Sequence, residues 1–361
     1  MYFIPIFAQK FGATFLDLGI IGTVWALAMT VTPIFIGYFS DRINPAWIYV
    51  SSLILNAFAT AILVMSRSVA DIMILRFIGG VGIEAFWVAA EIMVTELVPM
   101  DLRVREMGRY GIATVLGTLI GPLIGGIVIV NFGYNSLFII STVVIGFSIA
   151  QALVCVVRGY KRAETMASHD FAGDMRILRR LLPLYLMIVC YGVIWGLITT
   201  IFPGYANSMG ISAALIGFLF SAFGVARIFS YATAHRFSRG GRMRTLLYVS
   251  LIIFVGMVTV AIFPIFTAFL VGIALIGVGV GVFFPVTIDT LSRFFPSNRA
   301  GTAVASYETA INVGETVGPY LAGIVTAMTT VSDTFLVMSI FGILMALFAV
   351  NGPRSNKFHS C

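Results

Sequence analysis

The amino-acid sequence predicts an all-α polytopic membrane protein built from two repeated six-helix bundles. Hydrophobic residues make up 60% of its 361 residues and charged residues only 10%, and the mean hydropathy is +1.03. This composition excludes a soluble globular domain. Apolar runs of roughly 20 residues, each able to cross a bilayer as a helix, succeed one another along the chain. A motif of glycines and a proline also recurs, and this recurrence indicates the repeat.

The apolar runs predict eleven full membrane spans. One long polar stretch, residues 158–180, separates the runs of the first half from those of the second. The expected spans are residues 16–39, 46–65, 69–98, 107–130, 136–157, 181–203, 213–235, 245–264, 267–295, 301–327 and 334–352.

The recurring motif places small residues four apart inside two of these spans. Residues 117–126 return 197 positions later as residues 314–323. Glycines at that spacing let two helix backbones approach closely, as helices do where lipid offers no hydrophobic driving force. The same register pairs Tyr110 with Tyr307, and it continues upstream at an offset of 198. The expected helix-packing residues are Gly117, Gly121, Pro122, Gly125 and Gly126 in one copy and Gly314, Gly318, Pro319 and Gly323 in the other.

The repeat also predicts the domain organisation. We expect an N-terminal bundle over residues 1–157, a linker over residues 158–180 and a C-terminal bundle over residues 181–361. The register pairs Met1 with Thr199, whereas the matching helix of the second half begins near Leu181. The first bundle is therefore expected to lack about 18 residues of its opening helix. A genuine eleven-span protein is the alternative. Duplicated helix bundles are typical of secondary transporters.

The basic residues predict the orientation in the cell membrane. Of the 22 Lys and Arg residues, 18 fall in alternate connections, the linker and the C-terminal tail. The positive-inside rule then places the linker and Cys361 in the cytoplasm. The net charge of +7 is thus a sign of topology, and a nucleic-acid-binding function is not indicated. The three cysteines lack the spacing of metal ligands, and no cofactor motif is present.

Three segments resemble signature motifs of the major facilitator superfamily. Residues 37–42 match the family's Gly-x-x-x-Asp-Arg loop through Gly37, Asp41 and Arg42, although the second Gly and the trailing basic pair of that motif are absent. Residues 76–82 resemble the fourth-span motif Arg-x-x-x-Gly-x-Gly. Residues 117–126 match the fifth-span motif in full, which makes the drug–proton antiporter branch the most similar one.

The resemblance implies transport by alternating access and a cytoplasmic gate. In the family, the loop carboxylate sits against the amino end of the eleventh span, so Asp41 with Arg42 would latch the two halves together. Gly37 belongs to the same motif, Arg239 stands where the second half would repeat Asp41, and Asp289 is expected to be a gate charge. The alternative is an ordinary solvated turn.

Ionisable residues at membrane depth are the candidates for proton coupling and solute binding, because each costs about 3 kcal/mol to place there. Glu84 and Glu91 are seven apart and share a helix face. A buried cation that merely neutralises a carboxylate is the structural alternative. The candidates on the fourth, eighth and eleventh spans are Arg76, Glu84, Glu91, Arg227, Glu308, Asn312 and Glu315.

The favoured function is proton-coupled export of a small amphipathic solute, with Trp87, Tyr191 and Trp195 lining a cavity for it. One alternative is proton-coupled uptake of a metabolite or organic anion held by Arg76 and Arg227. A second is a non-transporting sensor or binding protein. The sequence shows no nucleophile–base or metal constellation, so no enzyme is expected. The expected partners are the solute, protons and the bilayer around a monomer.

Overall fold

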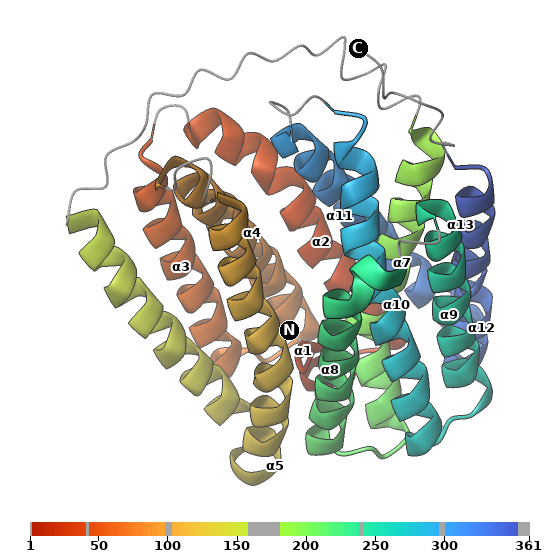
Figure 1. Ribbon diagram of the computed structural model, residues 1–361. Helices are drawn as coiled ribbons and strands as arrows, with labels where there is room; N and C mark the ends of the chain where they lie inside the picture. Colours follow the sequence, from red (N-terminus) through yellow and green to blue (C-terminus); the bar gives the residue numbers. More distant parts are fainter. Residues whose placement is uncertain are drawn as a thin grey trace, which may run out of the picture. The chain divides into compact units, whose positions relative to one another are not determined.

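The computed structural model describes residues 2–40, 43–97, 103–157, 181–237, 241–295 and 300–352, and the secondary structure of these residues is helical (Figure 1). The helices are α1 (Ile4–Gln9), α2 (Phe15–Ser40), α3 (Pro45–Ile62), the 3-10 helix η1 (Leu63–Met65), α4 (Val69–Leu97), α5 (Arg103–Val157), α7 (Leu182–Ser208), α8 (Ala213–Phe237), α9 (Arg242–Ile262), α10 (Phe266–Ser292), α11 (Ala300–Met328), α12 (Val331–Met338) and α13 (Ile340–Val350).

Nine segments of the described chain are long and apolar enough to cross a membrane. One of them, on α5, covers two expected spans, because α5 is interrupted at Gly133, whose φ of 80° and ψ of 176° are not helical. Such a φ suits glycine, which lacks the Cβ that would clash there. The helix α11, 29 residues long, matches the expected span 301–327 but is not among the nine. The spans expected from the apolar runs therefore correspond to helices, and the last of them, 334–352, is covered by α12 and α13 together.

Several helices begin where a hydroxyl and a carboxylate three residues apart cap each other. At the start of α2, Asp17 accepts a hydrogen bond from the Thr14 backbone N–H at 2.8 Å, and the Thr14 hydroxyl accepts one from the Asp17 N–H at 3.2 Å. The same reciprocal pattern links Thr330 with Asp333 at the start of α12. These bonds satisfy backbone donors that the first turn of a helix leaves unpaired.

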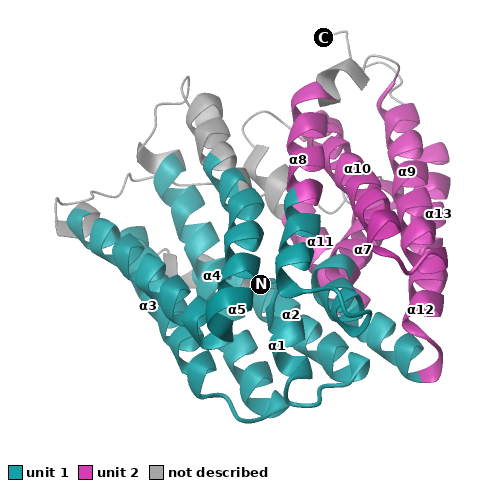
Figure 2. Ribbon diagram, turned by 90° about the horizontal axis from the view of Figure 1, so that it is seen from below, with its two compact units in different colours: residues 1–167, 198–221, 319–327 teal, residues 168–197, 222–318, 328–361 magenta. Residues whose placement is uncertain are grey.

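The chain divides into two compact units, which are described separately (Figure 2). The first comprises residues 1–167, 198–221 and 319–327, and the second comprises residues 168–197, 222–318 and 328–361. In the first unit α4 packs on α2 and α3, and α3 packs on α5. In the second unit α9 packs on α10, α12 and α13. The boundaries expected for two bundles and a linker stay a prediction.

Close helix contacts within the first unit follow the repeat. A Cβ on Gly217 of α8 would overlap the Pro122 carbonyl group of α5, and a Cβ on Gly19 of α2 would overlap the Pro319 carbonyl oxygen of α11. Both positions therefore need a residue without a side chain. Gly19 and Gly217 are repeat equivalents, as are Pro122 and Pro319. The unit thus holds two copies of one contact.

The remaining motif glycines are not packed alike. Gly314 and Gly318 contact the α7 backbone, with a Cβ on Gly314 lying 2.8 Å from the Gly192 Cα and one on Gly318 lying 2.7 Å from the Val193 Cα. Gly125, Gly126 and Gly323 also meet neighbours closer than ordinary van der Waals contact. By contrast, no described atom lies within 4 Å of a Cβ built on Gly117 or Gly121. The close approach expected at the motif is thus observed at its other glycines.

Candidate functional site

The first unit holds Arg76 against an indole ring. The guanidinium carbon of Arg76 lies 3.6 Å from the ring centroid of Trp25, and Arg76 is only 6% exposed. Gly80, one turn further along α4, permits this approach, because a Cβ there would lie 2.9 Å from the Trp25 carbonyl oxygen. A cation over an aromatic face is attracted by its quadrupole. In the Arg-x-x-x-Gly motif, the glycine thus lets α4 come close to α2, and the arginine one turn earlier lies over a ring of α2.

Two nitrogen donors at this contact have no hydrogen-bond acceptor among the described residues. They are the Nε of Arg76 and the Nε1 of Trp25, and both atoms are buried. A buried donor without an acceptor costs about 1–3 kcal/mol. Because both groups can only donate, the contact is suited to an incoming acceptor oxygen.

The carboxylates expected on α4 lie on one unbroken helix. Glu84 is 9% exposed, whereas Glu91 is half-buried. Since α4 runs without interruption from Val69 to Leu97, the seven-residue spacing places both on one face. The neighbouring Trp87 is half-buried, and its ring lies edge-on to Phe86 with 5.4 Å between centroids. The first unit thus places Arg76 and the two expected carboxylates, Glu84 and Glu91, on a single helix.

The second unit gathers aromatic rings around a second arginine. The guanidinium carbon of Arg227 on α8 lies 5.3 Å from the ring centroid of Trp195 on α7. Tyr191, one turn before Trp195, is 3% exposed and stacks on Phe283 of α10, with 4.6 Å between centroids and 16° between planes. Three helices thus contribute to one cluster of rings and charge.

The α11 carboxylates belong to the same cluster. Glu308 and Glu315 are within electrostatic range of Tyr191, as is Arg227. Glu315 is 8% exposed, whereas Glu308 is exposed. Asn312, between them on α11, is buried. One cation and two carboxylates leave this cluster with a formal charge of −1.

The structure adds residues that the sequence did not single out as site residues. Tyr307 is 1% exposed and lies within electrostatic range of Tyr191, Arg227 and both α11 carboxylates. Its ring meets Phe284 edge-on at 5.3 Å between centroids. The only sequence signal for Tyr307 is its match with Tyr110, which gave no reason to place it beside Arg227. Trp25 in the first unit had no signal at all.

The gate residues are only partly described. Gly37 lies in α2, whereas Asp41, Arg42 and Arg239 lie outside the described residues. Asp289 on α10 forms ion pairs with Arg242 and with Arg293, the latter at 3.4 Å. Its side chain is 47% exposed, so these pairs are worth little to stability. A gating role for these residues stays a prediction.

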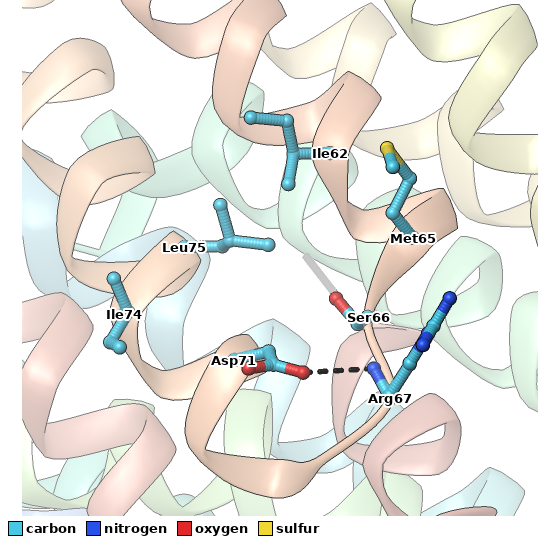
Figure 3. A pocket seen from close by; sticks show the side chains of 7 residues that line it. All are labelled: Ile62, Met65, Ser66, Arg67, Asp71, Ile74 and Leu75. Atoms are coloured by element: carbon cyan, nitrogen blue, oxygen red, sulfur yellow. Dashed lines mark hydrogen bonds between the residues drawn. The ribbon is translucent and has the colours of Figure 1, made fainter.

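A small pocket of about 310 Å³ is lined by residues between positions 62 and 75, none of which is a candidate site residue (Figure 3). Asp71 points toward the connection between η1 and α4 and accepts hydrogen bonds from the backbone N–H groups of Arg67 and Ser68 at 2.9 and 3.0 Å. The Asp71 carboxylate is thereby committed to starting α4, and we do not treat the pocket as a site. The described residues contain no cluster of His, Cys, Asp and Glu that could hold a metal ion.

Comparisons with known proteins agree with this architecture. The family model of the Major Facilitator Superfamily matches residues 1–263 and, again, residues 184–359. Multidrug resistance protein MdtG of Escherichia fergusonii is 22% identical, with 99% of this chain and 90% of that protein covered. The gentisate transporter of Corynebacterium glutamicum is 24% identical, with 94% and 80% covered.

A solved structure shares the fold. It is a bacterial homologue of the human lysosomal transporter Spinster, in an inward-facing and unoccupied conformation. The TM-score is 0.78 at 13% identity, over 96% of this chain and 91% of that one. The expected all-α transporter fold is confirmed.

Proposed function

Because the chain belongs to the Major Facilitator Superfamily of membrane transporters, we propose that it exports a small amphipathic solute in exchange for protons. The observation that carries this proposal is the cluster of the second unit, where Arg227, Glu308 and Glu315 leave a formal charge of −1 beside aromatic rings. Family membership argues against the expectation of a non-transporting sensor.

The charge balance of this cluster supports exchange. An organic cation neutralises the excess negative charge and places its apolar part against Tyr191, Phe283 and Trp195. A proton on either carboxylate neutralises the same charge. Cation and proton therefore compete, and the arrival of one favours the release of the other. Competition of this kind at a site that faces the two sides of the membrane in turn gives proton-driven export.

Glu84 is the candidate for proton coupling in the first unit, because it is more deeply buried than Glu91, the other carboxylate expected on this face of α4. The substitution Glu84→Gln removes the titratable group with little change of shape. We expect solute binding and solute–solute exchange to persist, because neither requires net proton movement, and proton-driven accumulation in everted vesicles to be lost.

Glu91→Gln serves as the matched control on the same face of α4. A well-folded Glu84→Gln protein with normal gradient-driven accumulation would contradict the role of Glu84. Loss of folded protein would instead indicate that Glu84 neutralises a buried cation, since removing one partner of a buried pair costs about 3–5 kcal/mol.

A second candidate function is proton-coupled uptake of an organic anion. The observation that favours it is the pair of buried donors, Arg76 Nε and Trp25 Nε1, that have no acceptor in the described part of the chain and that a carboxylate would satisfy. Similarity to the gentisate transporter points the same way. Trp25→Phe removes one donor and keeps an aromatic ring. If uptake is the function, an inward proton gradient should drive accumulation of an aromatic carboxylate, and Trp25→Phe should weaken it. Accumulation of an amphipathic cation in everted vesicles would favour export.

The direction of transport depends on orientation, which we propose from the basic residues. The linker and Cys361 are expected in the cytoplasm of a cell with this protein in its cell membrane. An impermeant thiol reagent should label Cys361 in everted vesicles and not in intact cells. Labelling in intact cells would reverse the assignment.

A further inference from the structure

We infer that Thr287 and Tyr307 form a subsite in the second unit for an uncharged hydroxyl group carried on an aromatic ring of the solute. This inference rests on the proposed transport function and names the class of solute. Thr287 is 0% exposed and Tyr307 is 1% exposed. Neither hydroxyl has a hydrogen-bond partner in the described part of the chain.

The two residues are linked through Phe284 of α10. The ring of Tyr307 contacts Phe284 edge-on, and Thr287 follows Phe284 by three residues, so it lies on the same side of α10. Thr287 also follows Phe283 by four residues, and Phe283 carries the stacked ring of Tyr191. Tyr191 and Tyr307 are in electrostatic range of each other. The hydroxyls therefore lie beside the aromatic cluster and are not scattered through the unit.

Helix geometry does not require these groups to be unpaired. A threonine within a helix can donate to the carbonyl four residues earlier. Thr290, one turn along α10, does so to Val286 at 2.6 Å, and Thr326 of α11 does so to Ala322 at 2.7 Å. Likewise Tyr185 of α7, a buried tyrosine, pairs its hydroxyl with that of Ser306 at 2.7 Å. Among the described residues, a third buried hydroxyl without a partner is that of Ser66, which lies in the first unit, so Thr287 and Tyr307 are the two in the second.

A pair of unpaired hydroxyls costs stability unless a ligand satisfies it. Each buried group without a partner is unfavourable, whereas a hydroxyl that meets a ligand hydroxyl both donates and accepts. The aromatic rings on either side favour a ligand hydroxyl attached to a ring. The nearby charges Arg227, Glu308 and Glu315 favour a cation elsewhere on the same molecule. A phenol with a short alkylamine has this chemistry.

The test compares tyramine with phenethylamine, which differ by one phenolic hydroxyl. Binding to purified protein in detergent should favour tyramine by about tenfold, the value of one buried hydrogen bond at the upper end of the usual range. Tyr307→Phe should reduce this preference to near unity. The same substitution should raise the unfolding temperature of the solute-free protein, because it removes an unpaired buried group. Thr287→Val, which is nearly isosteric, should act in the same two directions.

Satisfied hydroxyls provide the controls. Tyr185→Phe and Thr290→Val each remove a hydrogen bond that the structure shows, so each should lower the unfolding temperature and keep the preference for tyramine. A gain in stability with a loss of discrimination, confined to Tyr307 and Thr287, supports the subsite.

Three results would overturn the inference. The first is a lower unfolding temperature for solute-free Tyr307→Phe and Thr287→Val, which would indicate satisfied hydroxyls. The second is an unchanged preference for tyramine in both variants. The third is equal binding of tyramine and phenethylamine to the wild-type protein, or no binding of either. Flux in proteoliposomes separates this inference from the transport proposal. If the preference for tyramine depends on Tyr307 but a proton gradient drives no tyramine flux, the subsite is supported and amine–proton exchange is refuted.

Discussion

The two copies of the Gly-Pro segment have the same pattern but different surroundings. In α11, Gly314 and Gly318 lie against the backbone of α7 in the second unit. Their equivalents in α5, Gly117 and Gly121, have no described atom within 4 Å of a Cβ. At the proline end the copies agree, because the carbonyls of Pro122 and Pro319 each lie against a glycine of another helix.

This difference shows what a small-residue motif determines. Glycines four apart make a close approach sterically available, but a partner helix must supply the opposing backbone. At the proline ends, the partners Gly19 and Gly217 are themselves repeat equivalents, so both copies of the motif form a close contact. At the other ends, within the described residues, only the α11 copy meets a partner. Each of the following predictions tests one side of this comparison.

The largest effect is expected at Gly314. In Gly314→Ala the new Cβ would overlap the Val189 carbonyl oxygen and lie 2.8 Å from both the Gly192 Cα and the Val193 N. All three are backbone atoms, which a rotamer change cannot move. We expect a loss of about 3 kcal/mol in stability, measured as the unfolding temperature and the yield of monodisperse protein in detergent.

Gly117→Ala is the matched control, because Gly117 is the repeat equivalent of Gly314. Its stability should change by less than about 1 kcal/mol, and in the favourable direction, since alanine is the better helix former. Equal losses at the two positions would mean that α5 also has a close partner at Gly117.

An intermediate effect is expected at the proline ends. Gly19→Ala and Gly217→Ala each introduce a Cβ against a proline carbonyl, and we expect each to cost about 2 kcal/mol. The two losses should be similar, because the contacts are repeat equivalents. The unfolding temperatures of the two variants provide the measurement, and a large loss in only one would break the symmetry inferred here.

The smallest loss of stability is expected at a polar contact between repeat-equivalent residues. Asn207 donates from Nδ2 to the Gln9 Oε1 at 2.9 Å, and Gln9 donates from Nε2 to the Gly204 carbonyl oxygen at 3.1 Å. Gln9→Ala and Asn207→Ala should each cost about 1 kcal/mol. In a double-mutant cycle the two losses should be less than additive, because the residues share one hydrogen bond. Additive losses would show that the amides do not interact.

Most of the fold followed from local patterns. The spans were predictable because the length of an apolar run decides whether it can cross the bilayer, and that length does not depend on neighbouring segments. The break between the expected spans 107–130 and 136–157 is observed at Gly133. The glycine-rich stretch at Gly277, Gly279 and Gly281 of α10 serves helix packing, because a Cβ on each would meet atoms of α8 or α9.

The site was predictable only as a set of residues. The sequence identified Arg76 and Arg227 because charge at membrane depth is rare and costly. It did not identify Trp25 as the ring under Arg76, nor Tyr307 as a member of the Arg227 cluster. Asp289, expected as a gate charge, has arginine partners at positions 242 and 293, of which only the second follows from helix spacing.

The sequence by itself determined where the helices lie, that they are duplicated and which charges they carry, because each of these follows from the order of residues along the chain. Tertiary structure decided which faces meet. In a soluble protein the apolar face of a helix marks the core, but here lipid is as apolar as the interior and the two faces carry similar side chains. Only the contact of Phe284 on α10 with Tyr307 on α11 shows that Thr287 and Tyr307, ordinary residues in the sequence, lie near the same cluster.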